Sequence, residues 1–377
     1  MDRLVGAGRI GNSRSRSWRR RRMVETKTHD GAGAPRALPE GVILGMGNPL
    51  LDVSAHVTPD FHEKYGIKSG TAILAEAHHE PLYEDLVQNF KVDYVAGGAT
   101  QNSIRIAQWM SQSPNATAYI GCIGKDAFGE TLTEACRGAG VTPHYYITEE
   151  KPTGVCAVTI IDKERSLTTK LDAANEYKHV HTLSEPIQDV IERAKIFYIA
   201  SFFLTVPEGP QSVLHIAEHA AKANKIFCMN LSAEFLIDFF AEPMLNALPY
   251  MDFVFANETE AAAFGRKHEL GSDLAEVALK VSAMPKENGA RPRVVVFSQG
   301  ADPTIVACNG KVTLYPVPPL KPELLVDTNG AGDAFVGGFL ARLAADFDIA
   351  ECVRAGHYAA RVVIQRSGCT VPDQPDI

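Results

Sequence analysis

Residues 327–333, with the sequence Asp-Thr-Asn-Gly-Ala-Gly-Asp, combine residue types that could transfer a phosphoryl group. Apolar side chains recur at helical spacing directly after them, which predicts that a helix begins in this segment. The first turn of a helix carries unpaired N–H groups and a partial positive charge. The small residues Gly330, Ala331 and Gly332 would let a phosphoryl oxygen come close to those groups, so we expect an anion-binding turn here.

Asp333 ends this turn, where a carboxylate would repel a bound phosphate. We therefore expect Asp333 to act as a general base that takes a proton from an attacking hydroxyl group. The alternative is a helix-capping aspartate that follows a loose turn. An apolar run at residues 324–326 predicts a buried strand before the turn, so that the segment would connect a strand to a helix.

The overall composition is that of a globular protein. The chain has 377 residues, 45% hydrophobic and 22% charged, which suits one large domain or two unequal ones. It has no run of about 18 apolar residues, so we expect no membrane-spanning helix and no membrane partner. Its seven cysteines are scattered, which indicates reduced thiols of an intracellular protein and neither a disulfide framework nor a zinc site.

Positive charge is concentrated at the start of the chain. The first 22 residues contain eight arginines and one aspartate, although the whole chain has a net charge of −8. The rest is thus acidic, which argues against nucleic acid as a partner of the folded body. The arginine-rich start suits a nuclear signal, an organelle presequence or an RNA-binding arm. The interpretation that we favour is a disordered extension over residues 1–38, because few apolar residues occur there.

Two polar residues interrupt the apolar start of the predicted folded part. A strand at residues 42–44 is followed by a glycine- and proline-containing turn and by the alternating residues 51–55, which predicts strand, turn and strand. Asn48 and Asp52 would be simple turn formers or, if buried, would need a polar partner. A ligand with hydroxyl groups would supply one.

A second glycine pair, Gly97 and Gly98, precedes another predicted helix. Paired glycines permit a close approach of the backbone to a ligand, and Asn102 in the first turns of that helix could then bind a polyol. The alternative is a helix with a glycine-rich start and no ligand.

The stretch 141–171 alternates or runs apolar with β-branched residues and shows no helical period. This pattern predicts a small antiparallel sheet inserted between α/β units, and another short strand is expected at residues 67–75. A charged hairpin turn at residues 162–165, which includes Arg165, is typical of a solvated loop.

From residue 196 onward, predicted strands alternate with helices, which indicates parallel strands joined by crossover helices. Ligands of such sheets collect at the carboxyl ends of the strands. Asn257 and Glu260 follow one strand, and Ser298 and Gly300 follow another. Asn257 and Glu260 would form a helix capping box or, in a phosphoryl-transfer enzyme, the acid would hold magnesium through water.

The chain contains neither the G-x-x-x-x-G-K-[ST] phosphate loop nor the set of protein-kinase signatures. It combines instead an anion-binding helix start that carries a carboxylate, a distant glycine pair and an inserted sheet that could serve as a lid. These parts suit transfer of the terminal phosphoryl group of ATP to an alcohol.

The chain resembles the PfkB family of sugar and nucleoside kinases, which has the ribokinase fold, and within that family the eukaryotic adenosine kinases. The resemblance covers residues 40–377 and is carried by residues 45–52, 96–102, 119–129, 198–205, 257–260, 327–340 and 354–360. It implies an α/β protein with a three-layer α/β/α large domain around a mostly parallel central sheet. It also implies a small β-sheet lid, built from segments near 48–56, 67–75 and 141–171.

The activity implied by the resemblance is ATP-dependent phosphorylation of adenosine at its 5′-hydroxyl, which gives AMP and ADP in purine salvage. ATP and Mg²⁺ would be the cofactors. The resemblance further implies a monomer that works in the cytoplasm, and the arginine-rich start adds the nucleus as a second expected location.

The resemblance also implies site roles. Asp333 would deprotonate the 5′-hydroxyl, the N–H groups of residues 330–333 would stabilise the moving phosphoryl group, and Arg165 would reach the phosphates when the lid closes. Ribose would contact Asn48, Asp52, Gly97, Gly98 and Asn102. Adenine would be enclosed by Leu74, Leu167, Leu171 and Phe203. The nucleotide would contact Asn257, Ser298, Gly300 and Asn329, with Glu260 organising the metal. Ala72 stands where these kinases carry glutamine, which affects one expected adenine contact.

Two other functions use parts of the same pattern. A ribokinase-like or fructokinase-like sugar kinase is disfavoured by the apolar residues expected in the lid. A catalytically silent nucleotide-binding regulator is disfavoured by the intact Asp333 and its glycines.

Overall fold

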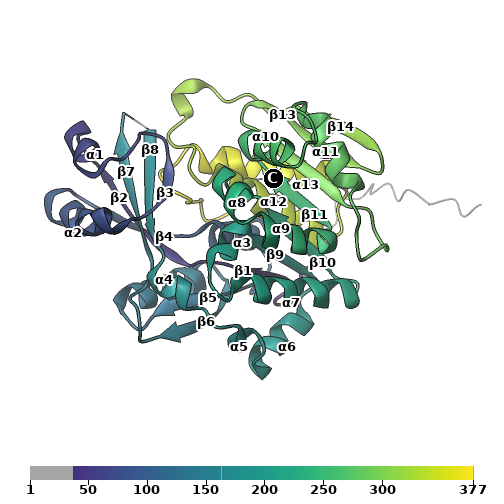
Figure 1. Ribbon diagram of the computed structural model, residues 1–377, viewed down its shortest axis with the longest axis horizontal. Helices are drawn as coiled ribbons and strands as arrows, with labels where there is room; N and C mark the ends of the chain where they lie inside the picture. Colours follow the sequence, from purple (N-terminus) through teal and green to yellow (C-terminus); the bar gives the residue numbers. More distant parts are fainter. Residues whose placement is uncertain (1–36, 163, 377) are drawn as a thin grey trace, which may run out of the picture. The chain divides into compact units, whose positions relative to one another are not determined.

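The computed structural model describes residues 37–376 apart from residue 163, so the arginine-rich extension expected at 1–38 lies almost wholly outside the described residues. The described part contains two β-sheets with helices packed against them (Figure 1). None of its helices is long and apolar enough to cross a membrane.

The large sheet has nine strands in the order β14-β13-β12-β11-β10-β9-β1-β5-β6. All neighbouring pairs are parallel except those that involve β13 and β14. Its strands are β1 (Ile43–Met46), β5 (Thr117–Gly124), β6 (Thr142–Thr148), β9 (Ile196–Ala200), β10 (Ile226–Asn230), β11 (Phe253–Ala256), β12 (Val294–Gln299), β13 (Asp302–Cys308) and β14 (Lys311–Tyr315). The mostly parallel central sheet expected from the sequence is thus confirmed.

The helices cover both faces of this sheet. They are α3 (Ala99–Ser111), α4 (Ala127–Gly138), α5 (His179–Thr182), α6 (Glu185–Arg193), α7 (Gly209–Lys222), α8 (Glu234–Phe239), α9 (Ala241–Ala247), α10 (Glu258–Lys267), α11 (Leu274–Ala283), α12 (Ala331–Ala344) and α13 (Ile349–Val363). Because side chains alternate along a strand, Leu44 and Met46 of β1 pack in the core with α6 to α11, whereas Ile43 packs on the other face with α3, α12 and α13. This is the expected three-layer arrangement.

The small sheet has five strands in the order β3-β8-β7-β2-β4, beside which α1 (Pro59–Tyr65) and α2 (Glu80–Asn89) lie (Figure 1). Its strands are β2 (Leu50–His56), β3 (Ala72–Leu74), β4 (Asp93–Gly97), β7 (Val155–Ile161) and β8 (Glu164–Lys170). The predicted segments near 48–56 and 67–75 are therefore in this sheet, and β7 and β8 form the predicted hairpin. The strand β4 was not predicted.

Two expectations about strands are wrong. Residues 142–148 were expected in the small sheet, but β6 pairs in parallel with β5 at the edge of the large one. The reason is that α4 connects β5 to β6, and a strand-helix-strand unit returns the chain to the same sheet. The β-branched composition on which the expectation rested does not distinguish the two sheets.

The second error concerns the apolar run before the anion-binding turn. Leu324 ends a short 3-10 helix, Pro322–Leu324, and the residues Leu324, Leu325 and Val326 are 43%, 38% and 46% exposed. Pro322 favours a turn here, and the turn leads directly to α12. The segment therefore connects a turn, not a strand, to the predicted helix.

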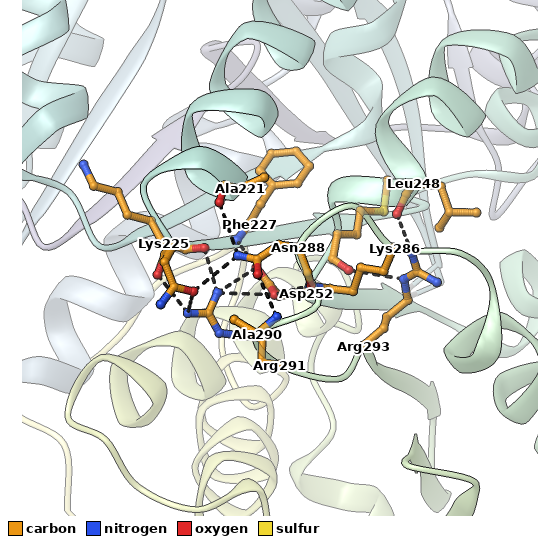
Figure 2. A network of polar contacts seen from close by, with 12 residues as sticks. Ala221, Lys225, Phe227, Leu248, Asp252, Lys286, Asn288, Ala290, Arg291 and Arg293 are labelled. Carbon is orange, nitrogen blue, oxygen red and sulfur yellow. Dashed lines mark hydrogen bonds and ion pairs between the residues drawn. The ribbon is translucent and has the colours of Figure 1, made fainter.

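A buried ionic network lies at the amino ends of β10, β11 and β12 (Figure 2). Asp252 accepts a hydrogen bond from the N–H of Phe227 at 2.9 Å and forms an ion pair with Lys286 Nζ at 2.8 Å. The guanidinium of Arg293, which is 1% exposed, donates to the carbonyls of Met251, Val281, Met284, Leu248 and Pro285. These bonds connect the loops at this end of the sheet.

Candidate active site

A cavity of about 380 Å³ lies between the carboxyl ends of the large sheet, the first turns of α3 and α12, and the inner face of the small sheet. Of the residues predicted from the sequence, those that line it are Asn48, Asp52, Leu74, Gly98, Asn102, Leu167, Leu171, Phe203, Asn257, Glu260, Ser298, Asn329, Gly330, Gly332 and Asp333. Four others, Gly97, Arg165, Gly300 and Ala331, do not line it. The tertiary structure thus brings together residues that are far apart in the sequence, such as Asn48 and Asp333, which are 285 positions apart.

The predicted anion-binding turn has the expected helix start. Gly330 precedes α12 with a φ of 75°, a left-handed conformation that suits glycine. The N–H of Ala334 donates to Gly330 O at 2.8 Å and that of Ala331 to Thr328 O at 3.2 Å. The N–H groups of Gly330, Gly332 and Asp333 have no hydrogen-bond partner in the described part of the chain. Three donors, and not the four expected, are therefore free to bind an anion.

Asp333 lies in the first turn of α12, within reach of α3. Its Oδ2 accepts a hydrogen bond from Asn102 Nδ2 at 3.0 Å. The two helices come this close because Gly337 faces α3, where a Cβ atom would lie 2.5 Å from Ser103 O. Burial raises the pKa of Asp333 to about 7, although the bond from Asn102 lowers it. Near neutral pH this carboxyl group can both accept and release a proton.

Asp52 lies on β2 and carries a second perturbed carboxyl group. Burial raises its pKa to about 7, and the negative charge of Asp333 adds to this rise. Gly97 does not line the cavity, but a side chain there would overlap the carboxyl group of Asp52. Gly97 lies on β4, next to β2, and its role is therefore to leave room for the side chain of Asp52.

Two asparagines of the cavity lining have buried acceptor atoms without a partner among the described residues, Asn48 Oδ1 and Asn102 Oδ1. Both residues line the cavity, and Asn48 also donates from Nδ2 to Phe202 O at 3.3 Å. Buried polar atoms are nearly always hydrogen-bonded, so these acceptors indicate a ligand with hydroxyl or amino groups. Together with Asp52 they form the polar wall of the cavity.

A second group of lining residues, which we call the apolar wall, consists of apolar side chains. Leu167 and Leu171 belong to β8 and its end, Leu74 to β3, and Phe203 to the segment after β9. Sequence reasoning missed further apolar residues in the lining, among them Leu50, Phe202, Phe235, Phe335 and Val336. Leu50 could have been found, since it shares the face of β2 with Asp52 two positions later. A ligand that has both an aromatic ring and hydroxyl groups would match a lining of both kinds.

Asn257 and Glu260 are at the start of α10, next to the cavity. They form a capping box, in which Asn257 Oδ1 accepts from the N–H of Glu260 at 2.8 Å and Glu260 Oε2 from the N–H of Asn257 at 2.9 Å. The predicted structural role is thus confirmed. Glu260 is 5% exposed, and its burial raises its pKa to about 7. A nearby cation would stabilise its charged form.

No group of three or more metal-ligating side chains occurs within residues 37–376, residue 163 excepted. Mg²⁺ is commonly held by one or two carboxylates together with water and substrate phosphates. Glu260, a buried acid on the cavity wall, fits that mode of binding, whereas the described part of the site has no protein cage for a metal.

Ser298 and Gly300 differ in their placement. Ser298 lines the cavity and donates from Oγ to Ala256 O at 3.4 Å. Gly300 has a φ of 57° and lies in the turn after β12, outside the lining.

The charged neighbours of Arg165 suggested a solvated loop, but the structure does not place this residue in one. It lies on β8, directly after the hairpin turn, and its side chain is 9% exposed. It forms an ion pair with Asp327, in which Nε and Oδ1 are 2.9 Å apart, between the small sheet and the segment before α12.

Comparisons with known proteins support one kind of enzyme. The family model for pfkB family carbohydrate kinases matches residues 60–377. Adenosine kinase 2 of Arabidopsis thaliana is 54% identical over 338 residues, which cover 89% of this chain and 97% of that protein. Adenosine kinase of Dictyostelium discoideum is 46% identical over 330 residues, with 88% of this chain and 96% of that protein covered.

Solved structures agree with this. The crystal structure of Anopheles gambiae adenosine kinase in complex with P1,P4-di(adenosine-5) tetraphosphate superposes with a TM-score of 0.83 at 41% identity, covering 88% of this chain and 98% of that one. The adenosine kinase of Schistosoma mansoni, in complex with adenosine in an occluded loop conformation, gives a TM-score of 0.84 at 33% identity, covering 89% and 98%.

Proposed function

Because the chain belongs to the pfkB carbohydrate kinase family, and within it to the adenosine kinases, we propose that it transfers the terminal phosphoryl group of ATP to the 5′-hydroxyl of adenosine. The products are AMP and ADP. The observation that carries the proposal is the position of Asp333, a carboxyl group with a pKa of about 7 beside free N–H groups at a helix start, in a cavity lined by polar and apolar side chains.

In the proposed reaction, Asp333 takes the proton of the 5′-hydroxyl as its oxygen forms a bond to the terminal phosphorus. The bond from that phosphorus to the bridging oxygen of ADP breaks, and ADP leaves with the electron pair. The N–H groups of Gly330, Gly332 and Asp333 stabilise the charge on the transferred group. Asn102 orients Asp333 through the 3.0 Å hydrogen bond.

The polar wall is proposed to bind ribose and the apolar wall adenine. Asn48, Asp52 and Asn102 can accept hydrogen bonds from ribose hydroxyls, which would satisfy the two unpartnered asparagine oxygens. The apolar wall then encloses the base by contact and stacking. Since Ala72 also lines the cavity, the base has no side-chain amide to bind at this position.

The nucleotide is proposed to bind beside Asn257, Ser298, Gly300 and Asn329, with Arg165 near its phosphates. Magnesium, bound with the nucleotide and held through water by Glu260, would neutralise phosphate charge. Gly300 lies in the turn outside the cavity lining, so its contact would be made by the backbone.

The assay that tests the proposal compares adenosine, ribose and fructose as acceptors at equal concentration, with ATP and Mg²⁺, and measures ADP and the phosphorylated product. We expect AMP formation with adenosine and little turnover of either free sugar. Preference for a sugar would make the protein a sugar kinase, and ATP binding without turnover of any acceptor would make it a regulator.

Two further proposals rest on the family resemblance, namely that the enzyme is a monomer and that it works in the cytoplasm. Light scattering coupled to gel filtration would test the first. Fluorescence microscopy of the full chain and of a variant that lacks residues 1–22 would test the second, because nuclear signal in the full chain alone would assign a targeting role to the arginines.

A further inference from the structure

Asp327, the first residue of the anion-binding motif, is 3% exposed and has no role in the reaction proposed above. It forms an ion pair with Arg165, in which the Nε and Oδ1 atoms are 2.9 Å apart and the two side chains are 9% and 2% exposed. The other ion pairs of the small sheet and its helices, within the described residues, stay among residues 64–172. The pair of Arg165 and Asp327 instead joins a strand of the small sheet to the C-terminal half of the chain. It can form only when the small sheet lies against the start of α12.

The carboxylate of Asp327 also binds two other segments. Oδ1 accepts from the N–H of Asn329 at 2.9 Å, within the anion-binding turn, and Oδ2 accepts from the N–H of Gly368 at 2.9 Å. The next residue, Cys369, packs against Gly330, where a Cβ atom would lie 3.2 Å from that of the cysteine. One carboxylate therefore connects β8, the turn and the C-terminal segment.

The contacts of Arg165 do not use all of its N–H groups. Nε is in ion-pair contact with Asp327, Nη2 donates to Ser367 Oγ at 2.8 Å, and Nη1 donates to Ser54 Oγ at 3.5 Å. A guanidinium has five N–H groups in a rigid plane, so the contacts leave two for an anion. Its charge already reaches the cavity, since it lowers the pKa of Asp52 against the effect of burial.

We infer that Asp327 is a positioning residue for phosphoryl transfer: it holds the Arg165 guanidinium of the small sheet next to the anion-binding turn, where that cation meets the phosphates. This inference rests on the proposed function. It explains why an acid is buried beside a site for anions, where its charge by itself would weaken binding. The pair sets the direction of the guanidinium, and the bonds to Asn329 and Gly368 hold the acid in place.

A double-mutant cycle with Asp327→Asn and Arg165→Gln tests the inference. We expect Asp327→Asn to lower kcat at least about 10-fold with KM for adenosine changed less than about threefold, because the group acts on the phosphates and not on the nucleoside. If Asp327 acts through Arg165, kcat of the double variant will lie within about twofold of that of Arg165→Gln alone. Multiplied losses in the double variant would show a separate structural role and overturn the inference.

The ion pair of Asp252 and Lys286, drawn in Figure 2, provides a matched control. Asp252 pairs with Lys286 at 2.8 Å, and the side-chain exposures of 9% and 2% equal those of the Arg165 pair, but this pair lies at the opposite ends of the strands. Asp252→Asn should lower the melting temperature and leave kcat within about twofold of the wild type. An equal loss of kcat in this control would show that breaking any such buried pair impairs the enzyme, which would also overturn the inference.

Asp327→Glu serves if the asparagine variant does not fold. It keeps the charge but displaces the guanidinium, so we expect kcat to fall in the wild-type background and to stay unchanged in the Arg165→Gln background. A loss of the same size in both backgrounds would contradict the inference. Failure of the wild-type chain to phosphorylate adenosine would instead refute the proposed function.

Discussion

Three acids on the cavity wall, Asp52, Asp333 and Glu260, have pKa values raised to about 7, in each case mainly by burial. Such carboxyl groups are costly to keep charged without a ligand, and clusters of them are typical of functional sites. Hydroxyl groups and a cation would stabilise the charged forms. The acids therefore prepare the cavity for substrates at the expense of the stability of the free protein.

Replacement of Asp333 by Asn tests its role as the base. The substitution keeps the size of the side chain and a hydrogen-bonding contact with Asn102 but removes the proton acceptor. We expect kcat to fall at least about 100-fold, with adenosine affinity largely retained, which kinetics and calorimetric titration would measure. Unchanged turnover would show that Asp333 is not the base.

The pH dependence of activity follows from the same pKa. The base must be ionised, so kcat/KM should rise as pH increases through about 7 and then level off. Initial rates between pH 5.5 and 9 would measure this, at roughly constant ionic strength. A profile without any inflection in this interval would contradict the assignment.

The pH dependence of stability has the opposite sign. A carboxyl group whose pKa is higher in the folded than in the unfolded state binds more protons when folded, so the free energy of unfolding falls as pH rises between about 4 and 7. We expect the melting temperature of the ligand-free enzyme to decrease over this interval because of these acids. In the Asp333→Asn variant the decrease should be smaller. A variant whose melting temperature changes as steeply as that of the wild type would argue against a raised pKa.

At the scale of elements, the site depends on how closely chain segments approach one another. Gly98 precedes α3 with a φ of 94°, and a side chain there would overlap the carbonyl oxygen of Asn48. This glycine thus places Asn48 of the β1–β2 connection beside Asn102 of α3. The glycine pair was predicted to approach a ligand, and in the structure both glycines make close approaches to other residues of the chain.

Gly98→Ala should therefore impair the site more than the fold. We expect KM for adenosine to rise at least about 10-fold and the free energy of unfolding to fall by about 1–3 kcal/mol, because the left-handed conformation and the overlap both oppose the new side chain. Gly138→Ala in α4 is a suitable control, since nothing lies within 4 Å of the place that a Cβ atom would take there. Equal effects of the two substitutions would show that the close approach at Gly98 is unimportant.

At the scale of the whole molecule, the two ends of the large sheet have different tasks. The carboxyl ends of β10, β11 and β12 face the cavity, whereas their amino ends carry the Arg293 and Asp252 network. Burial lowers the pKa of Arg293 to about 10, and five carbonyl groups compensate for the loss of water. We interpret this network as a purely structural element.

Arg293→Met should accordingly destabilise the protein without altering catalysis. It leaves several buried carbonyl groups without donors, and we expect a loss of about 3–5 kcal/mol in the free energy of unfolding, measured by urea titration. In the protein that remains folded, kcat should be unchanged. Arg266→Met, at an exposed pair with Glu234, should cost less than about 1 kcal/mol. A selective loss of kcat in Arg293→Met would contradict the division of tasks between the two ends.

The amino-acid sequence alone was sufficient for the parallel sheet and the helix at the anion-binding turn. These features depend on local patterns, because alternation, helical period and glycine positions are set by neighbours along the chain. Local patterns and the family resemblance together supplied part of the cavity lining. The capping box of Asn257 and Glu260 was predicted for the same reason.

Only the tertiary structure decided the features that depend on contacts between distant segments. It placed β6 in the large sheet, left residues 324–326 exposed outside any strand, and used the N–H of Ala331 within the turn. It also paired Asp327 with Arg165, a residue that its charged neighbours had placed in a solvated loop. Burial and pairing arise when separate segments pack together, and no pattern along one segment contains that information.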